Sequence, residues 1–443
     1  MKITTLLWIL APLTLVVVST AVRADDASAG MAAASTGSTA PGAGIAAPGS
    51  SCDSDPSAPC DCCGPGTNKW DGTLKVGCGL RTSYNYITAQ NGPVSSSYNF
   101  FNPDDMRIYL SGTAFGGLIK GTLDTEVAGG GSFVSPDNIT NVDLLDGIAQ
   151  FELSDTVNFW IGRFLPPTDR ANLDGPFYMT PYDYPFASNY PSLLAGRDDG
   201  AAYWGQLGGG KLKWQLGAFN GIGRNYNSVT GDAVGPNATG QLMYMARVTV
   251  NLLDPEPGYY TQSCYFGDKE ILAIGMTVAG QTDGSGTAAD PTAFTAESID
   301  VMWEHRFGNC GVIDFEGAYY NYNYGNVVSP TASYLQNNPN QGNSGYVQLS
   351  YLMPQNICFC GISGKLQPFA RYQSYNRVYN ATAVAGTPYA STTGSPLFTE
   401  GTDIGVNYVI SGYNARVTVA WGQREAEGGE SFSLLRTGVQ LQY

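Results

Sequence analysis

The sequence predicts an all-β fold, a transmembrane antiparallel β-barrel of about sixteen strands. Three observations support this: an export signal, a period-two alternation of apolar and polar residues along the chain, and no later apolar run of the roughly eighteen residues that a membrane helix needs. The last segment, residues 431–443, alternates most clearly. Leu435 and Leu441 share one face, whereas Arg436 and Gln440 share the other. A strand with one face in lipid and one in water requires this pattern.

Residues 1–24 have the features of a secretory signal peptide. Lys2 provides a basic start, an apolar run covers Leu6–Val18, and Val22–Ala24 is an end that a signal peptidase accepts. The mature chain is therefore expected to be exported. This segment is excluded from the predicted fold.

The composition agrees with a barrel in the outer membrane of a Gram-negative-type bacterium. Tyr is frequent, with 28 residues, and its ring suits the aromatic girdles at the boundary between lipid and water. Removal of Lys2 and Arg23 with the signal takes the formal charge from −15 to −17, which excludes nucleic acid as a natural partner. Composition alone leaves a secreted adhesive β-protein as an alternative.

Composition also divides the mature chain into three parts. Residues 25–50 are rich in Ala, Gly, Ser, Thr and Pro and are expected to form a low-complexity, flexible linker. Residues 51–71 form a short Cys-rich segment, expected in the periplasm. From residue 72 to residue 443, strand-like segments alternate with turns, and this part is the predicted outer-membrane β-barrel.

The expected strands follow one another in order along this last part. They are Thr73–Ile87, Met106–Phe115, Gly117–Val127, Val142–Leu153, Val157–Phe164, Asp199–Leu207, Lys211–Asn220, Gln241–Leu252, Ile271–Gly280, Ser298–Phe307, Val312–Tyr322, Gly345–Leu352, Lys365–Val378, Thr402–Ile410, Ala415–Gly422 and Ser431–Tyr443. Short connections alternate with long ones, and the long ones are Asn91–Asp104, Pro166–Asp198, Gly221–Gly240, Gln281–Glu297, Asn323–Ser344 and Tyr379–Gly401. Short periplasmic turns and longer outer loops are typical of such barrels, so the alternation favours a barrel over a soluble sandwich.

Charged residues within the strands are expected to line the lumen. A charge on the lipid face near the bilayer midplane costs about 2–4 kcal/mol, so charges flanked by apolar neighbours should point inward. This rule assigns to the lumen Arg81, Arg107, Lys120, Arg163, Arg247, Arg306, Glu316, Arg371, Arg416 and Arg436. It also assigns Lys75, Asp124, Glu126, Asp300, Glu304, Asp314 and Asp403. So many charges predict a water-filled channel rather than a plugged apolar core.

The longest connection, Pro166–Asp198, is the predicted constriction loop. A structureless loop of this length is normally functional or disordered, and its many Phe, Tyr and Pro residues need burial. Folding into the channel would bury them, and packing over the outer rim is the alternative. The residues expected to narrow the channel are Asp169, Arg170, Asp174, Tyr178, Asp183 and Arg197. Their charges are of both signs, so the pattern does not determine ion selectivity.

Four short segments carry a family resemblance. Phe159–Pro167, Arg197–Gly205, Lys211–Gly221 and Thr402–Tyr408 resemble motifs of the phosphate-selective porin O/P family. The resemblance covers roughly residues 73–443 and implies a sixteen-stranded barrel, usually trimeric, that conducts small anions along Arg and Lys side chains. The mature chain is acidic and its expected lumen holds both signs, so the fold and passive diffusion are carried over, and phosphate is not.

Nine cysteines are expected to cluster at the periplasmic rim. An exported protein meets an oxidising compartment, so disulfides are predicted for Cys52, Cys60, Cys62, Cys63, Cys78, Cys264, Cys310, Cys358 and Cys360, with one thiol left over. Metal binding by the Cys60-Asp-Cys62-Cys63 run is the alternative, although its spacing matches no zinc motif. No Cys-x-x-Cys-His motif occurs, so no c-type haem is expected. No metal or cofactor is therefore assigned.

The predicted function is an outer-membrane porin for passive diffusion of small hydrophilic solutes or ions. The alternative is a non-conducting anchor or scaffold barrel, used in adhesion or as the sheath of a separate electron carrier. No enzyme is expected, because His305, the only His, has no motif that would make it part of a hydrolase. The expected partners are outer-membrane lipid, small solutes, two further copies in a homotrimer, and peptidoglycan or a periplasmic protein at the N-terminal segment.

Overall fold

The computed structural model describes residues 72–91, 94–127, 142–189, 196–221, 235–286, 288–323, 342–377, 398–426 and 431–443. The predicted signal peptide, linker and Cys-rich segment lie outside the described residues. Among the residues described, no helix combines the length and the apolar character needed to cross a membrane.

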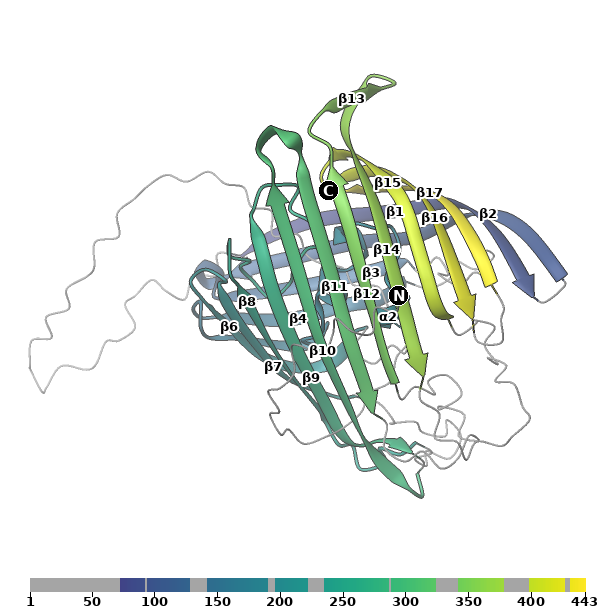
Figure 1. Ribbon diagram of the computed structural model, residues 1–443. Helices are drawn as coiled ribbons and strands as arrows, with labels where there is room; N and C mark the ends of the chain where they lie inside the picture. The colour runs from purple at the N-terminus through teal and green to yellow at the C-terminus, as the bar shows by residue number, and fades with distance from the viewer. Residues whose placement is uncertain are drawn as a thin grey trace, which may run out of the picture.

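Sixteen antiparallel strands form one closed wall (Figure 1), as the sequence predicts. The wall consists of β1 (Thr73–Asn91), β2 (Val94–Ala114), β3 (Ile119–Val127), β4 (Val142–Glu152), β5 (Asn158–Phe164), β6 (Asp198–Leu207), β7 (Leu212–Phe219), β8 (Met243–Asn251), β9 (Ile271–Gly286), β10 (Pro291–Arg306), β11 (Val312–Asn323), β12 (Gly342–Leu352), β14 (Ile362–Arg377), β15 (Phe398–Ser411), β16 (Ala415–Ala426) and β17 (Ser431–Gln442). A short strand, β13 (Asn356–Phe359), extends the sheet by pairing with the start of β14. Each strand pairs with its neighbours in chain order, and β12 pairs directly with β14.

The wall closes where the first strand meets the last. Residues Gly79–Gln90 of β1 pair with Ser431–Gln442 of β17 in unbroken antiparallel register. The Cys78 amide donates to the Tyr443 carbonyl at 3.3 Å, and the Tyr443 amide donates to the Cys78 carbonyl at 2.9 Å. Closure removes both open edges of the sheet, which a barrel in lipid must do because no water is there to bind a free edge.

Two connections that the sequence predicts as long loops are strand instead. β2 begins at Val94, so residues 94–104 pair with β1 rather than forming a loop, and β9 and β10 together extend from Ile271 to Arg306 with only a short connection. The prediction was wrong here because residues 95–99 are polar or aromatic without alternation, and residues 96–99 are all exposed. A strand with water on both faces carries no period-two signal.

The outward and inward faces of the wall alternate as a membrane barrel requires. On β9, Ile274 and Met276 are 38% and 55% exposed, whereas Ala273 and Thr277 are each 1% exposed. On β17, Leu435 and Leu441 face outward. Their apolar side chains form the outer surface that hydrocarbon can cover, and the polar neighbours point to the interior.

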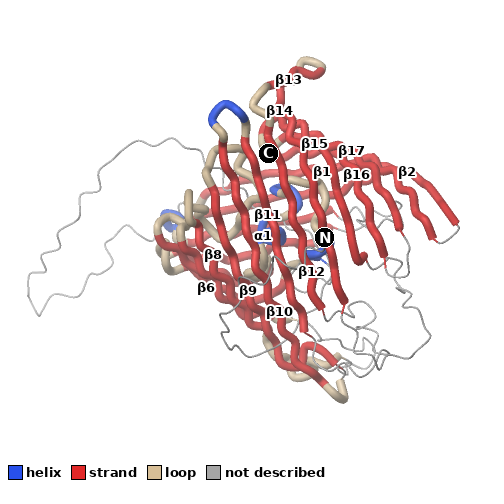
Figure 2. Tube along the Cα trace, in the orientation of Figure 1, coloured by secondary structure: helices blue, strands red, loops and turns tan. Residues whose placement is uncertain are grey.

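Two connections enter the interior of the barrel. The β5–β6 loop (residues 165–189) contains α1 (Arg170–Asp174), the 3-10 turn η3 (Pro176–Tyr178) and α2 (Phe186–Asn189). Figure 2 shows these short helices within the ring of strands. The β8–β9 turn (residues 252–270) has no regular structure. Two further 3-10 turns, η2 (Phe115–Gly117) and η4 (Gly308–Cys310), join neighbouring strands.

An aromatic cluster packs both connections against the wall. Trp160 of β5 stacks on Tyr259 of the β8–β9 turn with ring centroids 4.5 Å apart. Phe164 packs on Phe219 of β7 at 5.4 Å, and Leu173 of the β5–β6 loop belongs to the same buried cluster. Buried aromatic rings contribute large apolar areas, so this cluster anchors the two connections on the β5–β8 side of the interior.

Candidate functional site: the lumen

One side of the lumen wall is cationic. It is formed by inward side chains of the strands around the closure, and its guanidinium groups belong to Arg81, Arg107, Arg371, Arg416 and Arg436, each no more than 5% exposed. Inward carboxylates pair with three of these arginines: Asp105 with Arg81 at 2.5 Å, Glu126 with Arg107 at 3.4 Å, and Asp403 with Arg371 at 2.9 Å. Arginine outnumbers carboxylate on this side, so the surface is cationic.

The cationic side holds the β5–β6 loop by its carbonyl oxygens. Arg416 donates to the Thr180 carbonyl at 3.2 Å, and Arg371 donates to the Asp183 carbonyl at 2.7 Å. Arg81 donates to the Tyr182 carbonyl, and Arg436 forms an ion pair with the Asp183 carboxylate. The neutral donors Asn407 and Gln440 add bonds of 2.8 Å each, to the carbonyls of Thr180 and Phe177. A buried irregular segment needs such donors, because its carbonyls lack partners in a helix or sheet.

The opposite side of the wall is acidic. Inward carboxylates of β10 and β11 belong to Asp300, Glu304, Asp314 and Glu316, each no more than 2% exposed. Asp300 binds Arg247 of β8 through both oxygens, at 2.6 and 2.9 Å. Glu316 accepts hydrogen bonds from the hydroxyls of Ser263 and Tyr346. The lumen therefore carries charges of opposite sign on opposite sides.

The β8–β9 turn joins the acidic side to the β5–β6 loop. Arg170 of α1 forms a bidentate ion pair with Glu256 of the turn, at 2.9 and 2.5 Å, and both side chains are buried. Thr261 donates to Asp174 at 2.5 Å, completing a second link between the same two connections. Burial by itself would favour the neutral acid, but the Arg170 guanidinium outweighs it and lowers the pKa of Glu256 to about 2.

The residues expected to narrow the channel contact different parts of the barrel. Asp169 accepts a hydrogen bond from Tyr320 of β11 at 2.6 Å, and Asp174 and Arg170 contact the turn as described. Tyr178 packs on Tyr413 with ring centroids 5.3 Å apart. Arg197 lies just before β6 and binds both oxygens of Asp146 at 2.8 Å.

The expected lumen residues fall into three groups. Arg81, Arg107, Arg247, Glu316, Arg371, Arg416 and Arg436 are buried on the inner face. Lys120 and Arg306 share the inner face but lie near strand ends, with side chains 37% and 48% exposed. The prediction for Arg163 is wrong, because it shares the face of the exposed Phe159 and Ile161 and pairs there with Asp199 at 3.3 Å. It lies at the end of β5, where an outward charge is inexpensive.

Sequence reasoning missed three acidic partners, Asp105, Asp146 and Glu256, and the whole β8–β9 turn. Asp105 lies between the predicted loop, which ends at Asp104, and the predicted strand, which begins at Met106, and Asp146 of β4 was not assigned to the lumen. Glu256 lies in a segment without periodicity. The available signal was the length of residues 252–270, which is far more than a periplasmic turn needs, together with four aromatic residues within it.

The described cysteines divide into one buried and four exposed. Cys264 lies in the β8–β9 turn and is 1% exposed, whereas Cys78, Cys310, Cys358 and Cys360 are exposed. Among these five, no two are joined by a disulfide. Cys52, Cys60, Cys62 and Cys63 lie outside the described residues. The predicted disulfides therefore stay a prediction, and Cys264 is enclosed in the lumen rather than displayed at the rim.

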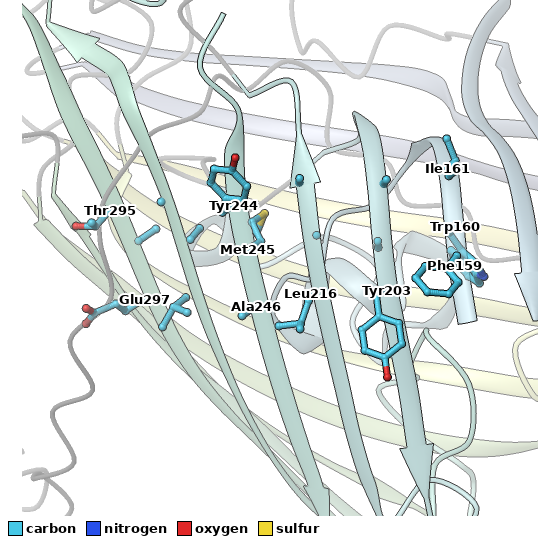
Figure 3. Close-up of a pocket in the computed structure, with 18 residues that line it drawn as sticks. Phe159, Trp160, Ile161, Tyr203, Leu216, Tyr244, Met245, Ala246, Thr295 and Glu297 are labelled. Carbon is cyan, nitrogen blue, oxygen red and sulfur yellow. The ribbon is translucent and has the colours of Figure 1, made fainter. Parts of the chain in front are cut away.

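The outer wall also carries a groove, across β5 to β10 (Figure 3), with a volume of about 640 Å³. Small residues line it, among them Ala201, Ala218 and Ala246, together with the rings of Tyr203 and Tyr244. Small residues let a neighbouring surface approach the backbone of the sheet closely. The groove is therefore a depression in the otherwise convex apolar wall.

Comparisons with known proteins give similarity of fold only. No family model matches the sequence, and no curated protein matches it. An anion-selective porin from Comamonas acidovorans is similar in structure with a TM-score of 0.48 and 13% identity, over 84% of this chain and 100% of that chain. The outer membrane channel DcaP of Acinetobacter baumannii gives 0.48 and 16%, over 84% and 97%, and OprB of Pseudomonas putida gives 0.49 and 9%, over 84% and 94%. These similarities are weak, and no solute or residue role is transferred from them.

Proposed function

We propose that this protein is an outer-membrane porin that allows passive diffusion of small hydrophilic solutes or ions. The observation that supports the proposal most is the lumen, with a cationic side at β1, β2 and β14–β17 and an acidic side at β10 and β11. Opposed rows of charge orient and select small solutes in a narrow aqueous path. An anchor that only holds a barrel in lipid would not need this costly arrangement, because buried charges require compensation.

The β5–β6 loop sets the size limit in this proposal. It contacts inward side chains of both charged sides, from Arg371 and Arg416 on one to Asp300 and Tyr320 on the other. A segment fixed across the lumen in this way narrows the path that solutes follow. The β8–β9 turn contributes to the same narrowing from the other end of the strands.

The resemblance to the phosphate-selective porin O/P family implies an anion path lined by Arg and Lys. In the described lumen, however, Arg81, Arg371 and Arg416 donate to loop carbonyls or carboxylates, and Arg247 is paired with Asp300. Guanidinium groups with such partners are poor sites for phosphate. We therefore propose weak selectivity among small solutes rather than phosphate uptake.

A non-conducting anchor or scaffold barrel is the second candidate. It is favoured by one observation: the charged lumen residues are almost completely covered, with Asp124, Asp174, Glu304 and Glu316 at 0% exposure. A lumen filled by its own connections needs no water path. Further parts of the proposal are a homotrimer, which the outer groove on β5–β10 would suit, and a disulfide-linked periplasmic collar formed by residues 51–71.

Single-channel recording in a planar bilayer with a salt gradient tests the proposal. We expect stepwise openings from the full chain, with larger steps from a variant in which residues 166–196 are replaced by a short linker. Unchanged steps in that variant would contradict the constriction. No openings from folded protein, judged by a heat-dependent shift in gel mobility, would support the anchor instead.

A further inference from the structure

Three potential metal ligands on the acidic side of the lumen lie in an arrangement that the proposed function does not explain. The thiol of Cys264, a carboxylate oxygen of Glu304 and a carboxylate oxygen of Asp314 all lie within 4.8 Å of one another, and the three residues are buried. They come from the β8–β9 turn, β10 and β11. Zinc binds sulfur at about 2.3 Å and oxygen at about 2.0–2.2 Å, so two of its ligands lie at most about 4.5 Å apart. The three atoms lie within a limit close to this value, and small side-chain shifts would let them share one ion.

The two carboxylates are in an unfavourable position without a cation. Glu304 lies directly opposite Asp314 in the register of β10 and β11, and like charges in that position repel. Within the described part of the chain, neither carboxylate forms an ion pair with a basic side chain. Glu316, two residues along β11 on the same face, adds a third carboxylate. Uncompensated buried charges of one sign are costly, and a divalent cation removes that cost.

Asp314 has an oxygen available for a ligand. Its Oδ1 accepts a hydrogen bond from Ser350 at 3.3 Å, but its Oδ2 is buried and has no hydrogen-bond partner. Asp314 is 1% exposed and directs its carboxylate at the other two donors. Buried carboxylate oxygens in native proteins are almost always satisfied, so an orphan here points to a group that is bound when the protein is complete.

The surroundings of the other two donors resemble an outer shell of a metal site. Glu304 accepts amide hydrogen bonds from Tyr265 at 2.6 Å and Gly267 at 2.5 Å, which fix its carboxylate. The Cys264 sulfur accepts from the Phe266 amide at 3.3 Å and from Gln367 at 3.5 Å. These hydrogen bonds fix the position of the sulfur, and outer partners of this kind orient metal ligands.

We propose that Cys264, Glu304 and Asp314 bind a divalent transition-metal ion, with Zn²⁺ as the best match. One soft thiolate and two hard carboxylates suit this borderline ion, and a water molecule would complete a tetrahedral set. Binding replaces the thiol proton with a sulfur–zinc bond and releases that proton to solvent. No electron transfer is involved.

The ion would pin the β8–β9 turn to the wall. Cys264 is the ligand from the turn, and Glu304 and Asp314 belong to two neighbouring strands, so the metal cross-links a connection to the barrel. The β8–β9 turn also holds the β5–β6 loop, through the ion pair between Arg170 and Glu256. A metal that fixes the turn therefore fixes both connections in the lumen. Any effect of the metal on channel conductance rests on the proposed function.

Cobalt substitution tests the metal site. The full chain is refolded in detergent with Co²⁺, and bound metal is measured by elemental analysis together with the thiolate-to-cobalt absorption band. We expect one thiolate-bound ion per chain in the wild type and in Cys358→Ser, which removes an exposed cysteine. Cys264→Ser should lose the absorption band, and Asp314→Asn should lose the ion or bind it at least about tenfold more weakly. Retention of the full band in Cys264→Ser would overturn the proposal.

A second measurement covers the case in which a variant fails to fold. The unfolding midpoint of the wild type is recorded with Zn²⁺ and with a chelator, with Asp268→Asn as control, since Asp268 is exposed. A zinc-dependent rise is expected in both proteins. No rise would overturn the proposal. Metal binding without any channel openings would contradict the proposed porin function and leave the metal site intact.

Discussion

The β5–β6 loop and the β8–β9 turn enter the same lumen but are held by opposite chemistry. The loop presents carbonyl oxygens to the cationic side, where Arg371 and Arg416 donate to them. The turn presents amides and hydroxyls to the acidic side, where Glu304 accepts from two backbone amides and Glu316 accepts from Ser263.

The difference shows that each side of the wall selects the backbone group it can satisfy. A guanidinium offers only donors, so an arginine side needs the carbonyl edge of a segment. A carboxylate offers only acceptors, so an acidic side needs the amide edge. Two contacts join the loop to the turn, the Arg170–Glu256 ion pair and the Thr261–Asp174 hydrogen bond. Substitutions at these contacts test how strongly the two connections depend on each other.

Arg170→Ala should have the largest effect on stability. It leaves the Glu256 carboxylate buried without its cation, which typically costs about 3–5 kcal/mol. Urea unfolding of the detergent-solubilised protein measures the loss. The double variant Arg170→Met with Glu256→Leu should recover most of it, because both charges are then removed. A loss below about 1 kcal/mol would mean that the pair does not join the two connections.

Acid should weaken the same contact. Glu256 has its pKa lowered from an ordinary 4.5 to about 2, because Arg170 outweighs the effect of burial. A lowered pKa in the folded state stabilises the protein above about pH 4.5, and this contribution is lost as the pH falls to about 2. The expected loss is about 3 kcal/mol.

The measurement is the free energy of unfolding against pH, compared with that of Glu256→Gln. The difference between the two proteins should shrink between about pH 4.5 and pH 2. A constant difference across that range would show that Glu256 does not titrate with a lowered pKa.

Thr261→Val should have a smaller effect. The Thr261 hydroxyl is the partner of Asp174 Oδ1, and the other oxygen of that carboxylate is buried without a partner. Loss of the hydroxyl should cost about 1–3 kcal/mol. Thr261→Ser keeps the hydroxyl and is the matched control. Equal unfolding midpoints for the two variants would contradict a role for this hydrogen bond.

Arg163→Ala should have the smallest effect. Arg163 pairs with Asp199 on the outer face, and the side chains are 40% and 55% exposed. Pairs this exposed contribute about 0–1 kcal/mol. Urea unfolding in high and in low salt measures the loss of unfolding free energy. A loss as large as that of Arg170→Ala would show that exposure does not explain the difference between the two ion pairs.

Sequence periodicity predicted the sixteen strands because each wall strand lies between lipid and a polar interior. It failed for residues 94–104 of β2, where residues 96–99 are all exposed and do not alternate, and it gave no information on residues 252–270, whose burial depends on distant partners. Arg163 was assigned inward by a rule for the membrane centre that does not apply at a strand end. The acidic side was predictable, since Asp300, Glu304, Asp314 and Glu316 alternate with apolar residues along their strands and all four were assigned to the lumen. Glu256 was not predictable in this way, because it does not lie in a strand.

The closure of the wall has a consequence for how the chain folds. Arg436 of β17 donates to Asn85 of β1 at 2.6 Å across a separation of 351 positions, so the seam joins opposite ends of the barrel sequence. Contacts between such distant residues form late, because a long segment must be ordered before they stabilise it. Until the seam forms, β1 and β17 are open edges that other strands can pair with. Assembly of this protein is therefore expected to be slow and most prone to aggregation just before its last strand is in place.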